Sequence, residues 1–261
     1  MSLISESQRF RQERAALIRD HFKTAAALSK ALTANAEGHL QRWVFELLQN
    51  ADDAGSDTCE IVVSDGTLIV ADNGSGLNPG SVESLATPFQ SDKSGEGTIG
   101  RKGVGFSAVY ELTDEPVLLS AGEAVTFSKR RFSDWLQNEP GIERFGSNAE
   151  DFPFLYALVP FGINAEDAEQ ELPLLADVGL KGGTRVAFRL RDPDAVEREV
   201  GALRTLDFTF LLNFAHLRRV VVRDASAVPV VEVSLTCGPE DGGSDDLVWK
   251  PRVKRGDHPD E

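Results

Sequence analysis

The sequence predicts an α+β fold, in which helices pack on one face of a mixed, mainly antiparallel β-sheet. Helical and strand patterns occur in clusters along the chain and do not alternate strictly, which disfavours a doubly wound parallel sheet. Residues 6–32 show apolar side chains at the helical period with charged residues between them, as in a long amphipathic helix. The first two strand patterns are joined by Asp65-Gly66, a dipeptide typical of a tight hairpin, so the sheet should contain an antiparallel pair.

The other elements are expected in the following order. A second helix covers residues 37–54 and stops at Gly55, and the first hairpin consists of strands 60–64 and 68–71. Residues 73–105 contain eight glycines, which indicates a functional loop region. Further helices are predicted at residues 82–86, 104–112 and 194–205, and further strands at 117–120, 124–127, 155–160, 184–190, 217–223 and 228–235. Residues 128–151 are expected to be irregular, and residues 237–261 to form an acidic loop and a charged tail.

Composition excludes several classes of function. The 261 residues include 27 Lys+Arg and 42 Asp+Glu, a net charge of −15 that would repel a phosphate backbone, so nucleic acid is disfavoured as a partner. Cys59 and Cys237 are too few for a disulfide framework, and the four histidines form no ligand-spaced cluster. A charged N-terminus and the lack of a run of ~20 apolar residues predict a cytoplasmic protein without a membrane span.

The second helix carries a polar strip. Glu46, Asn50 and Asp53 lie at i, i+4 and i+7, so a carboxylate, a carboxamide and a second carboxylate share one face. This spacing alone is also typical of a solvated helix face. The helix by itself therefore leaves both interpretations open.

Two glycine-containing motifs follow this helix. Asp72-Asn-Gly74-Ser-Gly76 comes directly after an apolar strand and alone is most simply a turn. In Gly100-Arg-Lys-Gly-Val-Gly-Phe106, three glycines allow backbone N–H groups to approach a phosphate at the start of a helix. The second motif lacks the Gly-Lys-Ser/Thr triplet of a P-loop, and its glycine order is the reverse of the dinucleotide fingerprint.

The motifs occur in one order and end with Gly183-Thr184, and together they resemble the boxes of the GHKL ATPase superfamily. Its members include DNA gyrase B subunits, ninety-kilodalton heat-shock chaperones, histidine kinases and mismatch-repair ATPases. Residues 46–54 resemble the N box, and residues 72–76, 100–106 and 183–184 resemble the three glycine boxes. The amino-acid sequence of residues 46–54 and 99–106 is most similar to the sacsin-type chaperone-like branch. The resemblance spans residues 46–184 and implies a Bergerat-type two-layer sandwich.

The resemblance implies a role for each matching residue. Asp72 resembles the carboxylate that accepts a hydrogen bond from the adenine amino group, supported by the Thr184 hydroxyl. Asn50 resembles the Mg²⁺ ligand, and Glu46 resembles the general base that positions and deprotonates the attacking water. Asp53 resembles a residue that lines the pocket near the sugar and the base.

The glycine boxes and their neighbours are expected to bind the rest of the nucleotide. Lys102 is the preferred phosphate contact and Arg101 the alternative, and residues 91–98 form a lid with Gly95 and Gly97 as hinge candidates. The full set of nucleotide-binding candidates is Asn50, Asp53, Asp72, Gly74, Gly76, Gly100, Lys102, Gly103, Val104, Gly105, Phe106 and Thr184.

The resemblance therefore predicts a chaperone-like ATPase that binds ATP and Mg²⁺, hydrolyses ATP slowly and switches conformation by lid closure. The alternative is a module that senses ATP without hydrolysing it. A histidine kinase is disfavoured, because His21 lacks the usual acidic neighbour after it. We expect an N-terminal helix at residues 1–36, the ATP-binding domain at 37–236 and a charged segment at 237–261. Following domains, partner subunits and a nucleotide-dependent dimer are the expected partners, and they would supply the Lys or Arg that relatives take from a following domain.

Overall fold

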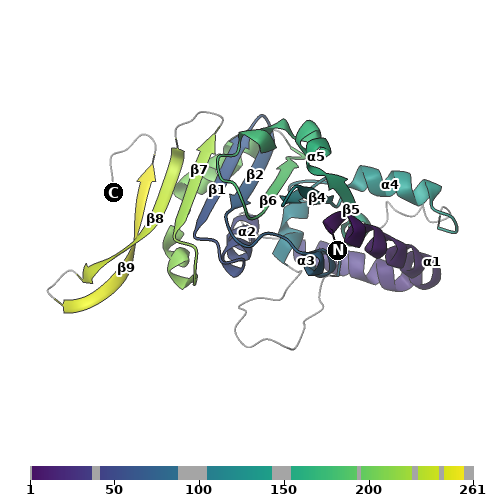
Figure 1. Cartoon of the computed structure of the whole chain (residues 1–261), viewed down its shortest axis with the longest axis horizontal. Helices are drawn as coiled ribbons and strands as arrows, with labels where there is room; N and C mark the ends of the chain where they lie inside the picture. Colours follow the sequence, from purple (N-terminus) through teal and green to yellow (C-terminus); the bar gives the residue numbers. More distant parts are fainter. Residues whose placement is uncertain are drawn as a thin grey trace.

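The computed structural model describes residues 2–36, 42–87, 105–142, 154–192, 195–224, 229–240 and 244–255. Within these residues, nine strands form one sheet in the order β5-β4-β3-β6-β2-β1-β7-β8-β9 (Figure 1). Only β1 and β7 pair in parallel, and every other neighbouring pair is antiparallel. The predicted α+β class with a mixed, mainly antiparallel sheet is therefore confirmed. The strands are β1 Thr58–Ser64, β2 Thr67–Asp72, β3 Val117–Ser120, β4 Glu123–Thr126, β5 Phe161–Asn164, β6 Arg185–Arg189, β7 Arg219–Asp224, β8 Pro229–Glu240 and β9 Ser244–Arg255.

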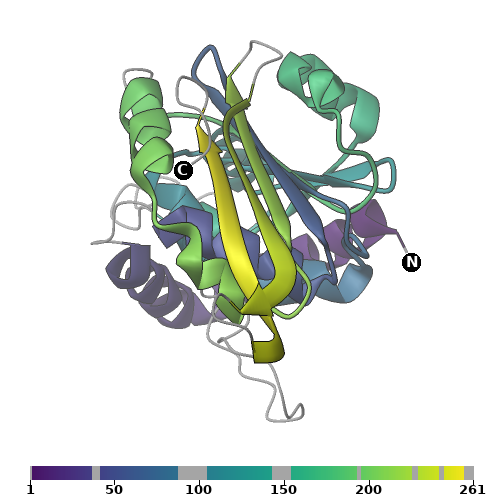
Figure 2. The same ribbon diagram turned by 90° about the vertical axis from the view of Figure 1, so that its left-hand side faces the viewer.

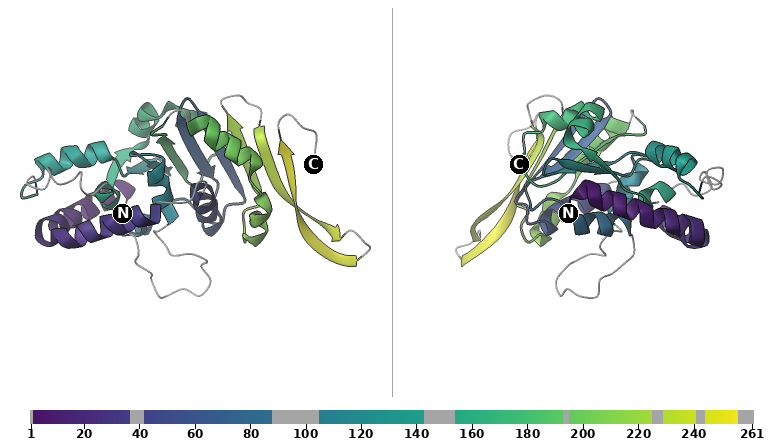
Figure 3. Two further views of the ribbon diagram at one scale, coloured as in Figure 1. Left: turned by 180° about the vertical axis from the view of Figure 1, so that it is seen from behind. Right: turned by 45° about the vertical axis from the view of Figure 1, so that its right-hand side comes forward.

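Helices cover both faces of this sheet, and one face carries most of them. The helices are α1 Leu3–Ala36, α2 Arg42–Asp53, α3 Pro79–Ala86, α4 Lys129–Asn138, α5 Ala165–Glu171 and α6 Ala195–Thr205. Short 3₁₀ helices lie at η1 Gly105–Glu111, η3 Leu155–Leu158, η4 Pro173–Asp177 and η5 Phe208–Asn213. Figure 3 shows from two further sides how α1 and α3 gather at the end of the molecule away from β8 and β9.

Alternation along the strands divides the buried side chains between two cores. In β1, Ile61 and Val63 belong to the larger core with residues of α1, α2 and α6, whereas Val62 belongs to a smaller core on the opposite face. The smaller core is closed by α5 and η4, with Ala168 and Leu175 buried. Figure 2 shows α2 and α6 on one side of the sheet and α5 on the other. The expectation of helices on one face thus describes the larger layer only.

The first hairpin follows the local sequence. Asp65 and Gly66 have φ angles of 48° and 73°, the left-handed values that a two-residue turn of this kind requires. The turn sets the register Ser64↔Thr67, so that Cys59 lies opposite Asp72. The predicted hairpin is confirmed, and it delivers Asp72 to the end of a fully buried strand.

Three expected elements differ from the structure. The sequence predicts a strand at residues 155–160, but Leu155–Leu158 form the buried 3₁₀ helix η3. A short apolar run has no periodicity that distinguishes a buried strand from a buried helical segment. The expected irregular stretch contains α4, capped by Ser128, whose side chain accepts from the Arg131 N–H at 3.1 Å. The expected helix at 104–112 is the 3₁₀ helix η1.

The C-terminal segment also differs from the expected loop. Residues 229–240 and 244–255 form the paired strands β8 and β9, with pairs from Val231↔Arg255 to Glu240↔Ser244. The sequence of β9 places two acidic residues before three consecutive apolar ones, so it lacks the regular alternation that predicts a strand. Among the described helices, none is long and apolar enough to cross a membrane.

Candidate functional site

Asp72 is the centre of the site. Its side chain is 8% exposed at the end of β2, where Oδ1 accepts from the Gly74 N–H at 2.7 Å. Oδ2 accepts from the Thr184 N–H at 3.3 Å, and the Asp72 N–H donates to the Thr184 carbonyl at 2.9 Å. Burial raises the pKa of Asp72, and the two backbone hydrogen bonds partly offset this rise. The structure thus brings together Asp72 and Thr184, the two residues assigned to adenine.

Three glycines let the backbone close around this carboxylate. Gly183 has φ +55°, and a Cβ there would lie 2.2 Å from the Asp72 carbonyl oxygen. Gly76 has φ +75°, and a Cβ there would lie 2.5 Å from Ser120 Oγ. A Cβ at Gly74 would lie 2.7 Å from the Ala54 carbonyl oxygen. These contacts leave no room for a side chain, which explains the glycines of the first and third boxes.

The end of α2 lies against the same turn. The Ser75 N–H donates to the Ala54 carbonyl at 2.9 Å, directly after the last helical residue. The buried face of α2 consists of Trp43, Val44, Leu47, Leu48, Ala51 and Asp52. Glu46, Asn50 and Asp53 lie outside that buried face, as their spacing predicted, and Asn50 and Asp53 are exposed. The polar strip therefore lies on an accessible side of α2, and the end of this helix contacts the turn that follows Asp72.

Glu46 has a cationic neighbour on its own helix. Arg42 Nε donates to Glu46 Oε1 at 3.2 Å, and the side chains are 30% and 23% exposed. The pair is spaced i, i+4, a geometry that contributes only a few tenths of a kcal/mol on an exposed helix. Arg42 therefore contacts one carboxylate oxygen of Glu46, and the side chain stays partly exposed.

Three residues that were not predicted from the sequence, Asp52, Asn73 and Ser120, also shape the site. Asp52 accepts backbone N–H groups from Ala215, His216 and Leu217 at 3.0, 2.6 and 2.7 Å, which fixes α2 to the segment before β7. Its position four residues after the buried Leu48 was a signal for burial. Asn73 and Ser120 gave no such signal.

Asn73 holds the turn against the loop that follows α2. Its Oδ1 accepts from Ser56 Oγ at 2.7 Å and from the Asp57 and Thr58 N–H groups at 3.2 Å. Its Nδ2 donates to Asp57 Oδ1 at 2.9 Å, and hydrogen bonds from Thr58 and Asn73 lower the pKa of Asp57. The bonds join the chain segments on either side of the β1-β2 hairpin, and Asn73 thereby supports the adjacent Asp72.

The second glycine box is only partly described. Gly105 begins η1, which packs against α1 and α2. Phe106 is 4% exposed and contacts Tyr110 edge to face at 5.6 Å between ring centroids, so its side chain belongs to the core. A nucleotide contact by Phe106 would have to come from its backbone. Gly100, Arg101, Lys102, Gly103, Val104 and the expected lid at 91–98 lie outside the described residues.

The site offers few protein ligands for a metal ion. Across the described parts of the chain, no three His, Cys, Asp or Glu side chains cluster in a way that could hold a metal. Asn50 presents one exposed carboxamide oxygen, one turn of helix from Glu46. This set fits Mg²⁺, which binds through one or two protein oxygens and takes its other ligands from phosphates and water.

One segment of the chain matches a family of known proteins. Residues 35–141 match the family described as histidine kinase-, DNA gyrase B-, and HSP90-like ATPase. The match covers less than half of the chain. The family implies ATP binding, and its matched segment contains the first two glycine boxes and all of α2.

Two individual proteins are similar to the chain that carries this ATPase segment. Protein NO VEIN of Arabidopsis thaliana is 30% identical over 116 residues, which is 42% of this chain and 4% of that protein. The crystal structure of the N-terminal domain of a DNA repair protein is similar with a TM-score of 0.41 and 14% identity. The similarity covers 78% of this chain and 55% of that one. The chain therefore matches only a small part of its plant relative.

Proposed function

We propose that the chain binds MgATP around Asp72 and hydrolyses ATP slowly. The observation that carries the proposal is the buried Asp72 carboxylate, held by the N–H groups of Gly74 and Thr184 in a segment with an ATPase family match. Both carboxylate oxygens keep a second lone pair for a ligand. An acceptor at this position selects the amino group of adenine, because guanine has an acceptor at the corresponding edge.

The residues of α2 have separate roles in this proposal. Asn50 holds Mg²⁺ through its side-chain oxygen, and the cation neutralises charge on the phosphates when it is bound. Glu46 orients a water molecule and accepts its proton, while Arg42 keeps the carboxylate in place through the 3.2 Å hydrogen bond. Asp53 lines the nucleotide near the sugar, at the end of α2 that contacts the Gly74 turn.

Conformational switching completes the proposal. The second glycine box and Lys102 bind the phosphates, and the segment 91–98 closes over them as a lid. The nucleotide state then alters contacts with following domains, partner subunits or a second copy in a chaperone-like ATPase of the sacsin type. A partner-supplied cation would raise the rate of phosphoryl transfer, so turnover by the chain alone is slow.

The experiment is a calorimetric titration of the purified chain with ATP, ADP and GTP, each with and without Mg²⁺. We expect adenine nucleotides to bind, GTP to bind at least tenfold more weakly, and Mg²⁺ to increase the affinity for ATP. Equal affinity for ATP and GTP would contradict the role of Asp72. A parallel assay of phosphate release distinguishes the alternative: binding without hydrolysis, even with partner domains present, would make the chain an ATP sensor.

A further inference from the structure

A second pocket lies far from the proposed ATP site. It has a volume of about 430 Å³. It is lined by the segment before β3, the start of α4 and the end of β6 with the residues that follow it. Arg185 and Thr184 lie at the nucleotide end of β6, whereas Arg189 and Arg191 lie at the opposite end beside the hairpin turn. Six residue steps from Thr184 to Leu190 correspond to about 20 Å of extended strand. The pocket is therefore separate from the candidate site around Asp72.

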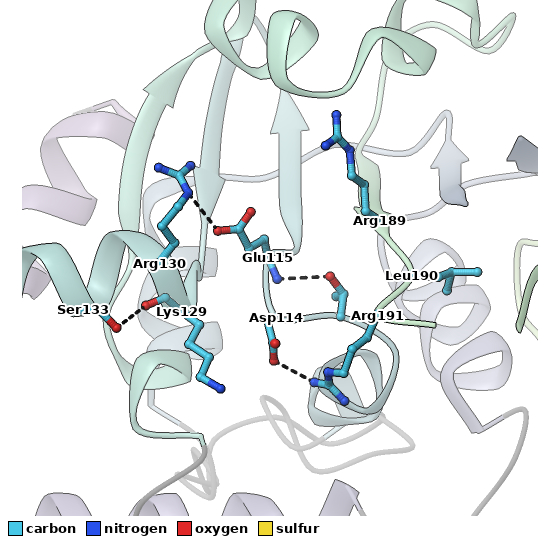
Figure 4. Close-up of a pocket in the computed structure, with 9 residues that line it drawn as sticks. Asp114, Glu115, Lys129, Arg130, Ser133, Arg189, Leu190 and Arg191 are labelled. Atoms are coloured by element: carbon cyan, nitrogen blue, oxygen red, sulfur yellow. Dashed lines mark hydrogen bonds and ion pairs between the residues drawn. The ribbon is translucent and has the colours of Figure 1, made fainter. Parts of the chain in front are cut away.

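Basic side chains dominate the walls of this pocket. Figure 4 shows Lys129 and Arg130 on one wall, Arg189 and Arg191 on the other, and the carboxylates between them. The lining contains four basic residues and two acidic residues, Asp114 and Glu115, a surplus of two positive charges. This surplus contrasts with the net charge of −15 for the whole chain.

The two carboxylates are already paired. Asp114 Oδ1 accepts from Arg191 Nη2 at 2.7 Å, and Glu115 Oε1 lies 3.3 Å from Arg130 Nε. Glu115 Oε1 also accepts from Ser128 Oγ at 2.7 Å, which fixes the carboxylate at the start of α4. One carboxylate thus neutralises one guanidinium on each wall.

The surplus charge belongs to Lys129 and Arg189. Within the described ranges, neither side chain has a carboxylate within ion-pair distance. Arg189 Nη2 donates only to the Glu171 backbone carbonyl at 2.9 Å, and the Glu171 carboxylate pairs with Arg131. Lys129 is the first residue of α4, where the helix dipole also favours an anion. Both side chains are exposed, so an anion from solution can reach them.

We propose that this pocket binds a phosphate monoester group. Such a group carries a charge of about −1.5 to −2 at pH 7, which matches the two cations without a carboxylate partner. Figure 4 shows Lys129 and Arg189 extending toward opposite ends of the pocket, so both exposed side chains turn inward when they bind one group. The volume of about 430 Å³ exceeds that of a single phosphate, so the pocket has room for further atoms, such as those of a phosphoserine in a peptide. Free inorganic phosphate has the same charged oxygens but lacks the ester group.

The test is a titration of the full chain, labelled with ¹⁵N, monitored by backbone amide chemical shifts. The probes are a short phosphoserine peptide flanked by glycines, its unphosphorylated counterpart and inorganic phosphate. We expect saturable shifts at residues 113–115, 129–133 and 189–191 with the phosphopeptide only or with both phosphate probes. Tighter binding of the phosphopeptide would support a chain-borne monoester, whereas tighter binding of inorganic phosphate would overturn the monoester and leave a site for the free ion. Raising the salt concentration should weaken either interaction.

Lys129→Gln is the decisive variant, because this exposed side chain makes no hydrogen bond or ion pair within the described chain and its loss should not disturb folding. It should weaken phosphate binding about tenfold or more, and Arg189→Gln should act similarly. Lys23→Gln, an equally exposed cation on α1, is the matched control and should leave binding unchanged. Shifts confined to residues outside the pocket, no saturation, or equal affinity in Lys129→Gln and Lys23→Gln would overturn the proposal.

Discussion

The Ser120 hydroxyl connects the end of β3 to Gly183. Ser120 Oγ donates to the Gly183 carbonyl at 2.9 Å and accepts from the Leu77 N–H at 3.0 Å. The same oxygen occupies the space that a Cβ at Gly76 would need. One buried hydroxyl therefore joins the two glycine-containing segments that surround Asp72.

Ser120→Ala should weaken both the fold and the nucleotide site. The substitution leaves the partly buried Leu77 N–H and Gly183 carbonyl without this partner, which costs about 1 kcal/mol of unfolding free energy. Urea unfolding measures this loss, and calorimetry should show weaker ATP binding because the Gly183 turn loosens. Ser64→Ala on β1, whose hydroxyl makes only an exposed hydrogen bond to Asp65, is the control and should change neither quantity.

Asp72→Asn should weaken binding of adenine nucleotides by about one to two decades. A carboxylate accepts from both the Gly74 and Thr184 N–H groups, whereas an amide must turn an NH₂ toward one of them. A lost charge-assisted hydrogen bond costs about 1.5–3 kcal/mol, which sets the expected loss of affinity. Asp65→Asn, at the other end of β2, is the control, since Asn tolerates its positive φ. Calorimetry with unchanged ATP affinity in Asp72→Asn would remove Asp72 from the site.

The raised pKa of Asp72 predicts a pH dependence of adenine binding. Because burial raises this pKa, the carboxylate takes up its proton at a higher pH than an ordinary aspartate and then loses acceptor capacity. Affinity for adenosine, which carries no phosphate, should fall as the pH decreases through the folded pKa. Stability has the opposite sign: the contribution of Asp72 to the unfolding free energy decreases as pH rises from its unfolded to its folded pKa. The residual affinity of Asp72→Asn should lack this dependence.

Local chemistry made much of the fold predictable. The Asp65-Gly66 turn, the apolar stripe of α2 and the strand patterns of β1 and β2 depend on neighbouring residues, and all appear in the structure. By contrast, α4 buries only Phe132 and Leu136, too few apolar positions to predict it within a charged stretch.

The candidate site was harder to predict from the amino-acid sequence than the fold. Asp72 and Thr184 are 112 residues apart, and their contact depends on β2 pairing with β6, which no local pattern encodes. Only the resemblance to a family brought them together in advance. Ser120 is one serine at the end of a short strand, and its two hydrogen bonds depend on residues at positions 77 and 183. Such tertiary contacts leave no periodic signal in the sequence.

Glu46→Ala should separate ATP binding from hydrolysis. Removal of the proposed base should lower phosphate release by roughly 10²-fold or more, with ATP affinity within a few-fold of the original. Arg42→Ala is the companion variant, because it removes the partner at 3.2 Å and leaves the carboxylate in place, so its effect on hydrolysis should be much smaller. Asn50→Ala should instead reduce the effect of Mg²⁺ on ATP affinity. Equal rates of phosphate release by Glu46→Ala and the original chain would mean that another residue is the base.

Substitutions of the adjacent residues Asp52 and Asp53 on α2 should affect different properties, the first stability and the second ATP binding. Asp52→Ala leaves three backbone N–H groups at residues 215–217 without their acceptor, so we expect a loss of unfolding free energy of about 3 kcal/mol or more. Asp52→Asn should be milder, because one amide oxygen can still accept the two N–H groups that Oδ1 now accepts, from His216 and Leu217. Asp53→Ala, on the exposed side, should change stability by less than about 1 kcal/mol but weaken ATP binding. Urea unfolding and calorimetry on the three variants test this, and an Asp52→Ala chain as stable as Asp53→Ala would contradict the anchoring role of Asp52.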